Sequence, residues 1–514
     1  MLSLAFSSAM LGIDGYIVRI EADSAPGVPV FAIIGLPDRA LNESRERVRA
    51  AIVNSGFGFP PGRLLINLAP ADIRKEGPGF DLPIALALLA TDDQLPREGV
   101  REYVAFGELA LDGTLRAVPG VLAMMLAAKN AGFTRVIVPQ ANLAEAALVG
   151  DIEIFAVPSL MEAVAVILGH GQKYRHRPEP FGPAPDTPSH ASDFGDVRGQ
   201  SIAKRALEIA AAGGHNVVLV GPPGCGKTML ARRVPSILPP MTNAEALDVT
   251  KVYSIAGLLG SEPTIVDTRP FRAPHHTISQ VALVGGGAHA KPGEISLAQH
   301  GVLYLDELAE FSRTALEVLR QPLEEGAITI SRAAATYTYP ARFMLVASMN
   351  PCPCGFRGAR GSDCRCDDAT VERYVAKLSG PLLDRIDLHI SVARISFDEM
   401  VGGQHAERSS AIRLRVASAR KRQSERLAEH RLNCNAEIAA ADVRALCPLD
   451  AGTLELLEAA MLRGTVSARA FDRVVRVART IADLDACQDI RREHVAEALL
   501  YRGLERARGA RAIV

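Results

Sequence analysis

The sequence predicts a multidomain α/β protein with an entirely helical C-terminal part. Short apolar segments typical of buried strands alternate with amphipathic helices up to about residue 397. The stretch HNVVLVGPPGCGKTMLARRV reads as a strand, a glycine-rich loop and a helix in succession. From about Asp398 onward the pattern is helical and holds no convincing strand. These three observations predict a central nucleotide-binding fold between an α/β region and a helical region.

Length and composition limit the number of domains, the extent of disorder and the kinds of partner that net charge alone could bind. A chain of 514 residues corresponds to about three domains at roughly 150 residues each. Its 48% hydrophobic and 22% charged residues exclude wholesale disorder. Lysine and arginine number 57 against 58 acidic residues, so the net charge of −1 excludes binding of polyanions through bulk charge alone. Local basic patches remain compatible with that balance.

The same sequence favours a soluble cytoplasmic protein without a membrane partner. The longest clean apolar runs, such as residues 82–90, are about half of the ~20 residues that a membrane helix needs. The N-terminus lacks the basic region of a signal peptide. Eight cysteines, one in the glycine loop and four in a tight cluster, are typical of a reducing compartment rather than of a disulfide framework.

Residues 1–170 form the first predicted domain. Its expected strands are FAIIGL, RLLINLA, VIVP and IEIFAV. The segment ALNESRERVRAAIVNSG predicts an amphipathic helix that begins near Asn42 or Ser44 and ends before Gly56. Residues 171–195 are rich in proline, glycine, serine and charge and lack periodicity, which predicts a linker. The central domain is then expected over 196–397 and the helical domain over 398–514.

The central domain carries a phosphate-binding motif. Residues 221–228 fit G-x-x-x-x-G-K-[ST] and lie between a strand and a helix. Backbone N–H groups of such a loop surround phosphate oxygens. Lys227 would reach the β- and γ-phosphates of ATP, and Thr228 would hold Mg²⁺. The rest of the predicted loop comprises Gly221, Pro222, Pro223, Gly224, Cys225 and Gly226.

Acidic and amide side chains follow the next two apolar strands. Asp306 and Glu307 end VLYLDE, so Asp306 can join the Mg²⁺ shell and Glu307 can activate the attacking water. Asn350 follows LVASM and can orient that water or the γ-phosphate. These residues together predict ATP hydrolysis. Arg385 and Arg469 are candidates for stabilising transition-state charge, although arginines commonly lie on solvated helix faces.

The order of these motifs makes a family recognisable. Five motifs follow one another along the chain: GPPGCGKT, LYLDE, SMNPCPCG, GPLLDRIDLH and SARAFDRVVRVARTIADL. Two further segments lead up to the acidic motif, PFRAPHHTISQVALVGGG and KPGEISLAQHGVLYLDE. The N-terminal FAIIGLPDRALNESRERVRAAIVNSGF, LINLAPADIRKEGPGFDLPIALALLA matches as well. Over nearly its whole length the chain resembles the magnesium-chelatase-like AAA+ proteins of the ComM/YifB family.

The resemblance implies an N-terminal Lon-protease-like α/β domain, an AAA+ P-loop NTPase core and a helical lid. It also implies a hexameric DNA helicase that promotes branch migration in homologous recombination during natural transformation. In that family pattern Arg385 would be the finger that reaches a neighbouring subunit's nucleotide, and Arg469 would be the sensor of the lid. The partners implied are single-stranded, forked or branched DNA and further copies of the chain.

The resemblance also raises two rival functions. Lon-type peptidases use a Ser–Lys pair, but the serine position corresponds to Gly79 and the lysine position to Leu122, so acyl transfer has no nucleophile or base. We therefore expect an inactive protease-like domain. A motor subunit of a magnesium chelatase, acting on a protein and porphyrin partner, shares the AAA+ core. Such subunits are expected to resemble this chain only from about Phe194 onward.

Three further groups of residues are candidates for binding a metal or DNA. Cys352, Cys354, Cys364 and Cys366 can surround Zn²⁺ tetrahedrally, although free reduced thiols are the alternative. Arg272, His275, His276 and Lys291 lie in loops that can contact DNA phosphates. Arg332, Tyr337 and Tyr339 combine charge with stacking surface. The alternative for the two tyrosines is that they form one face of a strand.

Overall fold

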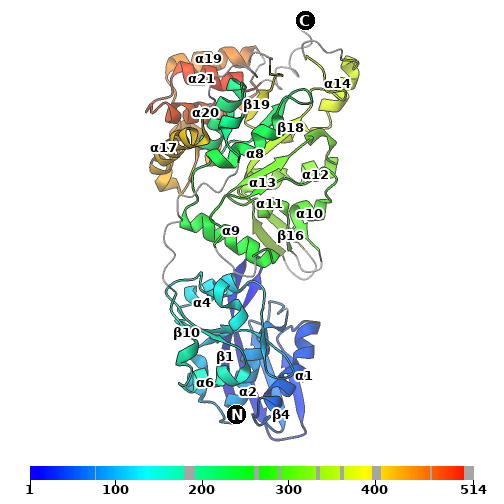
Figure 1. Cartoon of the computed structure of the whole chain (residues 1–514), viewed down its shortest axis with the longest axis vertical. Coiled ribbons are helices and arrows are strands. Elements are labelled where there is room, and N and C mark those ends of the chain that lie inside the picture. Colours follow the sequence, from blue (N-terminus) through cyan, green and yellow to red (C-terminus); the bar gives the residue numbers. More distant parts are fainter. Residues whose placement is uncertain are drawn as a thin grey trace. The chain divides into compact units, whose positions relative to one another are not determined.

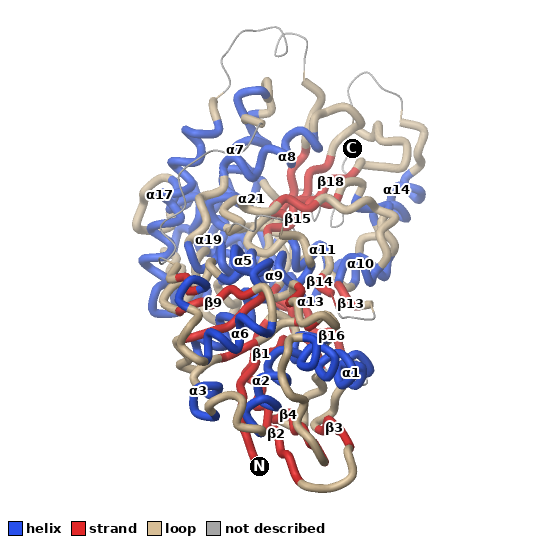
Figure 2. The backbone as a smooth tube through the Cα atoms, turned by 60° about the horizontal axis from the view of Figure 1, so that its bottom comes forward, coloured by secondary structure: helices blue, strands red, loops and turns tan. Residues whose placement is uncertain are grey.

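The structure is a computed structural model that describes residues 1–75, 77–178, 192–259, 265–287, 291–331, 336–358, 364–395, 407–463 and 466–502. The chain forms two compact units. Unit 1 comprises Met1–Ala184, Thr242–Val266 and Thr329–Tyr339, and unit 2 comprises Pro185–Met241, Asp267–Ile328 and Pro340–Val514. The strands of each unit are drawn red and the helices blue in Figure 2.

A mixed sheet of eight strands is the centre of unit 1. The strands lie in the order β10-β9-β8-β5-β1-β2-β4-β3. Their bounds are β1 (Leu2–Leu11), β2 (Asp14–Ala25), β3 (Val30–Ile34), β4 (Arg63–Ala69), β5 (Val104–Ala105), β8 (Arg135–Pro139), β9 (Glu153–Val157) and β10 (Arg175–His176). A small hairpin joins β6 (Glu108–Leu109) to β7 (Leu115–Arg116). The four strands expected from the sequence are therefore β3, β4, β8 and β9, and the long β1–β2 pair was not predicted.

Helices pack on this sheet through apolar side chains. They are α1 (Arg39–Asn54), α2 (Asp81–Thr91), α3 (Arg97–Arg101), α4 (Val121–Asn130), α5 (Leu143–Ala146) and α6 (Leu160–Ile167). Every residue of α2 is buried, so the longest apolar run of the chain is a core helix. The N-cap of α1 is Asp38, whose carboxylate accepts the Leu41 N–H at 2.7 Å. The predicted start at Asn42 or Ser44 was therefore wrong by about one turn, because an aspartate is an equally good cap.

Three segments depart from the predicted boundaries of the N-terminal domain. Strand β10 pairs with β9, so the first residues of the predicted linker belong to the sheet. Helix α9 (Asn243–Ala256) belongs to unit 1, where Leu247 packs against the core beneath α4. In the same unit, the Ser254 hydroxyl donates a hydrogen bond to Glu145. Strand β17 (Thr336–Pro340), paired with β16 (Ala327–Ser331), also lies largely in unit 1.

Unit 2 is built on a parallel sheet of five strands. Their order is β12-β15-β18-β11-β19. The bounds are β11 (Val217–Val220), β12 (Phe271–Arg272), β15 (Val302–Leu305), β18 (Met344–Met349) and β19 (Leu388–Ser391). A minor pair, β13 (Gly285–Gly286) and β14 (Lys291–Pro292), completes its strands among the described residues. The carboxyl ends of parallel strands meet at one edge, where ligands of open α/β sheets bind.

Helices surround this sheet and continue to the end of the described chain. Around the sheet lie α7 (Ser201–Gly213), α8 (Lys227–Ile237), α10 (Gln280–Val284), α11 (Glu294–Leu297), α12 (Arg313–Glu317), α13 (Arg320–Glu325), α14 (Asp368–Val375) and α15 (Gly380–Leu383). After them come α17 (Ser409–Leu427), α18 (Val443–Leu446), α19 (Ala451–Leu462), α20 (Ala468–Leu484) and α21 (Arg492–Leu500). The described residues from 407 onward contain no strand, which confirms the predicted helical region.

One hydrophobic core joins the sheet of unit 2 to these C-terminal helices. It runs from Phe194 to Tyr501 and includes residues of β11, α8, α17 and α20. The C-terminal helices gather together, coloured from yellow to red in Figure 1. The predicted α/β fold with a helical C-terminal region is therefore confirmed. Among the described residues, the structure contains no helix long and apolar enough to cross a bilayer.

Candidate nucleotide-binding site and cysteine cluster

The phosphate-binding loop connects β11 to α8. Gly224 and Gly226 have φ angles of 76° and 92°, a region that glycine enters at little cost. Gly226 caps α8, so the free backbone N–H groups of the first turn face the loop. The helix thereby begins at Lys227, as the motif predicts. This arrangement of N–H donors suits an anion such as a phosphate.

Lys227 and Asn350 meet at this loop. The Lys227 ammonium donates to the carbonyl oxygens of Gly221 at 2.6 Å and Pro222 at 3.0 Å. It also donates to Asn350 Oδ1 at 3.2 Å, from the strand end next to β11. The side chain predicted to orient the γ-phosphate thus lies beside the lysine predicted to bind it.

Hydroxyl groups connect Thr228 to Asp306. Thr228 Oγ1 donates to Asp306 Oδ2 at 3.0 Å. Ser348 donates to the other carboxylate oxygen, and the Glu307 backbone N–H donates to it at 3.0 Å. The Tyr304 hydroxyl lies 3.2 Å from Thr228 Oγ1 and 3.1 Å from Ser348 Oγ. The predicted magnesium ligands are therefore adjacent and held by two residues that were not predicted.

This network determines the charges of its members. Burial by itself would raise the pKa of Asp306, but hydrogen bonds from Ser348, Tyr304 and Thr228 outweigh it and lower that pKa. Burial raises the pKa of Tyr304 to about 12. At neutral pH the site therefore holds an ionised carboxylate next to neutral hydroxyls. Such hard oxygen donors fit Mg²⁺.

Glu307 extends from the end of β15 with a more exposed carboxylate. Its φ angle is 52°, a left-handed conformation that is uncommon for a residue with a side chain. The side chain is 56% exposed, and its Oε2 lies 3.3 Å from His276 Nδ1. The exposed carboxylate of the predicted base is thus accessible to water and held from one side by a histidine.

The two predicted arginines lie in different segments of unit 2. Arg385 binds Glu324 and donates to the Pro381 carbonyl at 2.6 Å, and its side chain is 12% exposed. Arg469 lies in α20, but its side chain is outside the described residues. One turn further along α20, Arg473 Nη1 donates to buried Asp387 at 2.9 Å.

The candidate DNA contacts have mixed surroundings. Arg272 makes a two-pronged ion pair with Glu294, at 2.6 and 2.7 Å. The rings of His275 and His276 lie 4.1 Å apart, and His275 Nδ1 lies 2.9 Å from Thr277 Oγ1. Lys291 is exposed on β14. Arg332 falls outside the described residues.

Of the two tyrosines in this candidate set, Tyr337 is half-buried and Tyr339 is buried at 1% exposure. The buried ring of Tyr339 cannot stack on DNA bases, so its role as a DNA contact is corrected to that of a packed strand residue.

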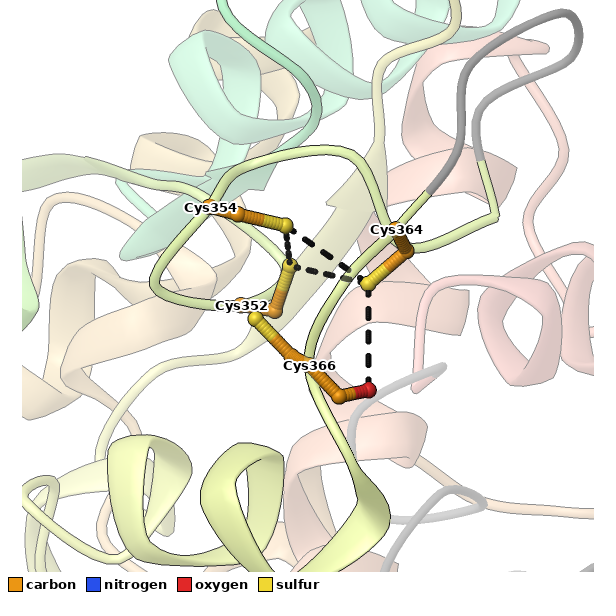
Figure 3. Close-up of side chains that lie close together, drawn as sticks. All are labelled: Cys352, Cys354, Cys364 and Cys366. Atoms are coloured by element: carbon orange, nitrogen blue, oxygen red, sulfur yellow. Dashed lines mark hydrogen bonds between the residues drawn. The ribbon is translucent and has the colours of Figure 1, made fainter.

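The four cysteines of the predicted cluster lie close together (Figure 3). The Sγ atom of Cys352 lies 3.3 Å from that of Cys354 and 3.7 Å from that of Cys364. Cys354 and Cys364 are 3.6 Å apart, and all four Sγ atoms, including that of Cys366, lie within 4.8 Å of one another. The other four cysteines are Cys225 in the phosphate loop, Cys434, Cys447 and Cys487.

In unit 1, the positions that correspond to the peptidase pair carry no reactive group. Gly79 has no side chain, and Leu122 is buried with its N–H donating to Glu145 at 3.0 Å. Lys75, at the start of the same KEGPG segment, is fully buried and donates to the Ile73 carbonyl at 2.8 Å. Its burial lowers the pKa of the ammonium.

Sequence reasoning missed Tyr304, Ser348 and the pairing of His276 with Glu307. A signal for the first two was present, because side chains two positions apart on a strand share a face. Tyr304 precedes Asp306, and Ser348 precedes Asn350, by two residues. No local signal joins His276 to Glu307, because several helices and strands lie between them in the sequence.

Comparison with known proteins gives a consistent result over the whole chain. Three family models match: "Magnesium chelatase, subunit ChlI" over residues 193–400, "Subunit ChlI of Mg-chelatase" over 20–142, and "Magnesium chelatase, subunit ChlI C-terminal" over 406–502. The chain is 42% identical over 509 residues to YifB of Escherichia coli, and 42% identical over 510 residues to the competence protein ComM of Haemophilus influenzae. Each of these alignments covers 98% of both chains.

Similarity to a chelatase subunit is more limited. The magnesium-chelatase 67 kDa subunit of Chlorobaculum parvum is 31% identical over 164 residues, which cover 31% of this chain and 23% of that protein. Full-length similarity thus extends to ComM and YifB, whereas this chelatase subunit shares one segment. With its phosphate loop, its parallel sheet and its helical C-terminal region, the chain belongs to the magnesium-chelatase-like ComM/YifB family of AAA+ proteins.

Proposed function

We propose that this protein is an ATP-driven DNA motor that promotes branch migration in homologous recombination during natural transformation. The observation that carries the proposal is the convergence of Lys227, Thr228, Asp306 and Asn350 at the carboxyl ends of three adjacent parallel strands. The link to DNA uptake rests on the full-length similarity to a competence protein.

In the proposed reaction each residue has a separate task. The N–H groups of the phosphate loop and Lys227 bind the phosphates of ATP. Asn350, next to Lys227, orients the γ-phosphate. Glu307 accepts the proton of the attacking water, for which its exposed carboxylate is suited. Thr228 and Asp306 would hold Mg²⁺, which supplies charge neutralisation at the phosphates when bound.

The motor is proposed to act as a homo-oligomer, with six subunits as the family pattern implies. Arg385 would then leave Glu324 and contact the nucleotide of the adjacent subunit, where an arginine can raise the hydrolysis rate by about 10³–10⁵. DNA would be held through phosphates by loops that carry residues such as Lys291. Native mass spectrometry with ATP and forked DNA present counts the subunits.

A second candidate function is a chelatase-like motor that acts on a protein and porphyrin partner. The observation in its favour is that all three matching family models describe a chelatase subunit. Against it, the alignment with the chelatase subunit covers 31% of the chain, whereas ComM aligns over 98%. Proteolysis is not proposed, because Gly79 and Leu122 supply neither nucleophile nor base.

Two assays distinguish the DNA motor from the chelatase-like motor. Phosphate release from ATP should rise several-fold when forked or single-stranded DNA is added to the full-length protein, and Lys227→Ala should abolish it. The same protein, incubated with a porphyrin, Mg²⁺ and ATP, should give no metallated product by absorption spectroscopy. The DNA-motor proposal would be rejected if no DNA stimulated ATP hydrolysis, or if the protein inserted Mg²⁺ into the porphyrin.

A further inference from the structure

The cysteine cluster has the dimensions of a metal site. Zinc bonded to four thiolates at ~2.3 Å places neighbouring sulfur atoms ~3.8 Å apart. The Sγ–Sγ distances among Cys352, Cys354 and Cys364 are 3.3, 3.6 and 3.7 Å. Cys366 completes a set in which every pair lies within 4.8 Å. The four side chains converge from two segments of the chain, as Figure 3 shows.

The chemistry of the four ligands selects the kind of metal. Soft thiolates favour zinc or iron over magnesium and calcium, and a set of four without a water is typical of a structural site. All four cysteines are free thiols, so none is committed to a disulfide. Of the four, only Cys352 is buried, and the described residues 351–358 and 364–367 contain one large apolar side chain, Phe356. A metal would therefore supply the main force that orders this segment.

The quartet also adjoins the nucleotide site within unit 2. Cys352 follows Asn350 by two residues, and Asn350 Oδ1 accepts a hydrogen bond from Lys227. A methyl group added to Gly355 would lie 2.7 Å from Pro223 Cδ and 3.7 Å from Asn350 Cγ. The turn at Gly355, directly after the first cysteine pair, is therefore packed against the phosphate loop. After Cys366 the chain enters α14, whose N-cap Asp367 accepts the Thr370 N–H at 2.9 Å.

We infer that Cys352, Cys354, Cys364 and Cys366 bind one structural Zn²⁺ and that this zinc-ordered turn supports the phosphate loop at Pro223 and the position of Asn350. The metal site stands on the thiol geometry alone, whereas its effect on nucleotide binding rests on the proposed function. Without zinc, the turn would lose its constraint on Asn350, and the nucleotide would bind less tightly.

Metal content is the first test. Full-length protein purified without chelator should contain close to one zinc per chain, as determined by inductively coupled plasma mass spectrometry. The Cys354→Ser/Cys366→Ser variant should contain almost none, whereas the matched control Cys487→Ser, which changes a cysteine outside the quartet, should match the wild type. Replacement of zinc by Co²⁺ should give the visible absorption spectrum of a tetrahedral thiolate complex. Wild-type protein without metal, with iron in place of zinc, or with metal that survives the double substitution would overturn the site.

Nucleotide binding is the second test, and it keeps the two claims apart. Zinc should be removed from the wild type with a chelator under reducing conditions, which avoids the need for the variant to fold. A fluorescent ADP analogue should then bind about tenfold more weakly, and added Zn²⁺ should restore the affinity. If the wild type contains zinc but its nucleotide affinity does not change when the zinc is removed, the metal site stands. The inference that the metal supports the phosphate loop is then contradicted. If DNA does not stimulate ATP hydrolysis, the proposed function fails, whereas the zinc site is still decided by the metal content alone.

Discussion

At the scale of single residues, the nucleotide site is organised by neutral hydroxyls as much as by charged groups. Tyr304 and Ser348 are at most 2% exposed and both contact the Thr228–Asp306 pair. Their hydrogen bonds lower the pKa of Asp306 despite its burial, so the carboxylate stays ionised. Glu307 lies outside this network except through its backbone N–H. The structure thus separates the residue that would hold a metal from the residue that would take a proton.

A substitution of Glu307 tests that separation. Glu307→Gln keeps the shape of the side chain but removes the base, so we expect ATP hydrolysis to fall by about 10²–10⁴ while ATP affinity stays within a few-fold of wild type. Phosphate release and equilibrium binding of a fluorescent ATP analogue measure the two effects. Hydrolysis that remains within threefold of wild type would show that another group accepts the proton.

The sequence predicts most of this site because the relevant residues follow the ends of apolar strands. Lys227, Thr228, Asp306 and Asn350 come together as their motif spacing indicates. The partners of Glu307 and Arg385 could not be predicted, because His276 and Glu324 are brought near by the paths of loops and short helices. Contacts of that kind carry no periodic signal.

At the scale of helices and strands, buried charges fix where α20 and α21 meet β19. Asp387, just before β19, contacts Arg473 of α20 and lies 3.6 Å from His215. Arg502, after α21, is buried and donates to the carbonyl oxygens of Ile386 and Asp387. Removing one partner of a buried ion pair such as Asp387–Arg473 typically lowers the free energy of unfolding by about 3–5 kcal/mol. These contacts attach the C-terminal helices to the end of the sheet.

The histidine in β19 makes this junction sensitive to acid. Burial, aided by the positive charge of Arg502, lowers the pKa of His389 to about 3, so the folded protein keeps the ring neutral. An unfolded histidine takes up a proton below about pH 6.5, so stability is lost as the pH falls from about 6.5 toward 3. Between about pH 7.5 and pH 5 this loss should be about 2 kcal/mol. The Asp387 pKa is lowered as well, but its contribution is lost only in stronger acid.

His389→Leu should remove most of that loss, whereas His430→Leu, at an exposed histidine, should not. Urea unfolding followed by circular dichroism at the two pH values gives the comparison. Equal pH dependence in wild type and His389→Leu would mean that other groups dominate acid unfolding.

The sequence predicts some elements better than others. Apolar strands such as β11, β15 and β18 were predicted because both faces are buried and the residues form continuous runs. The strands β1 and β2 were missed, since they mix buried and exposed positions with serines and charges. The two-residue strand β10 was assigned to a linker, because its pairing with β9 leaves almost no trace in the sequence.

At the scale of the whole molecule, the compact units do not follow the order of the chain. Residues 242–266 and 329–339 belong to unit 1 although unit 2 surrounds them in sequence. Glu145 illustrates the reason, because it receives hydrogen bonds from Leu122 of α4 and from Ser254 of α9. Sequence reasoning placed these segments in the central domain, since long-range packing has no local pattern. The division into three functional domains remains a prediction.

The central claim is that ATP hydrolysis at this site moves branched DNA. The most direct measurement is the conversion of a labelled four-way DNA junction to its products, followed by native gel electrophoresis. We expect wild-type protein to do this only with ATP and Mg²⁺, and we expect Lys227→Ala and Glu307→Gln to be inactive. Junction movement by Lys227→Ala, or none by a wild-type protein that binds the junction and hydrolyses ATP, would contradict the account.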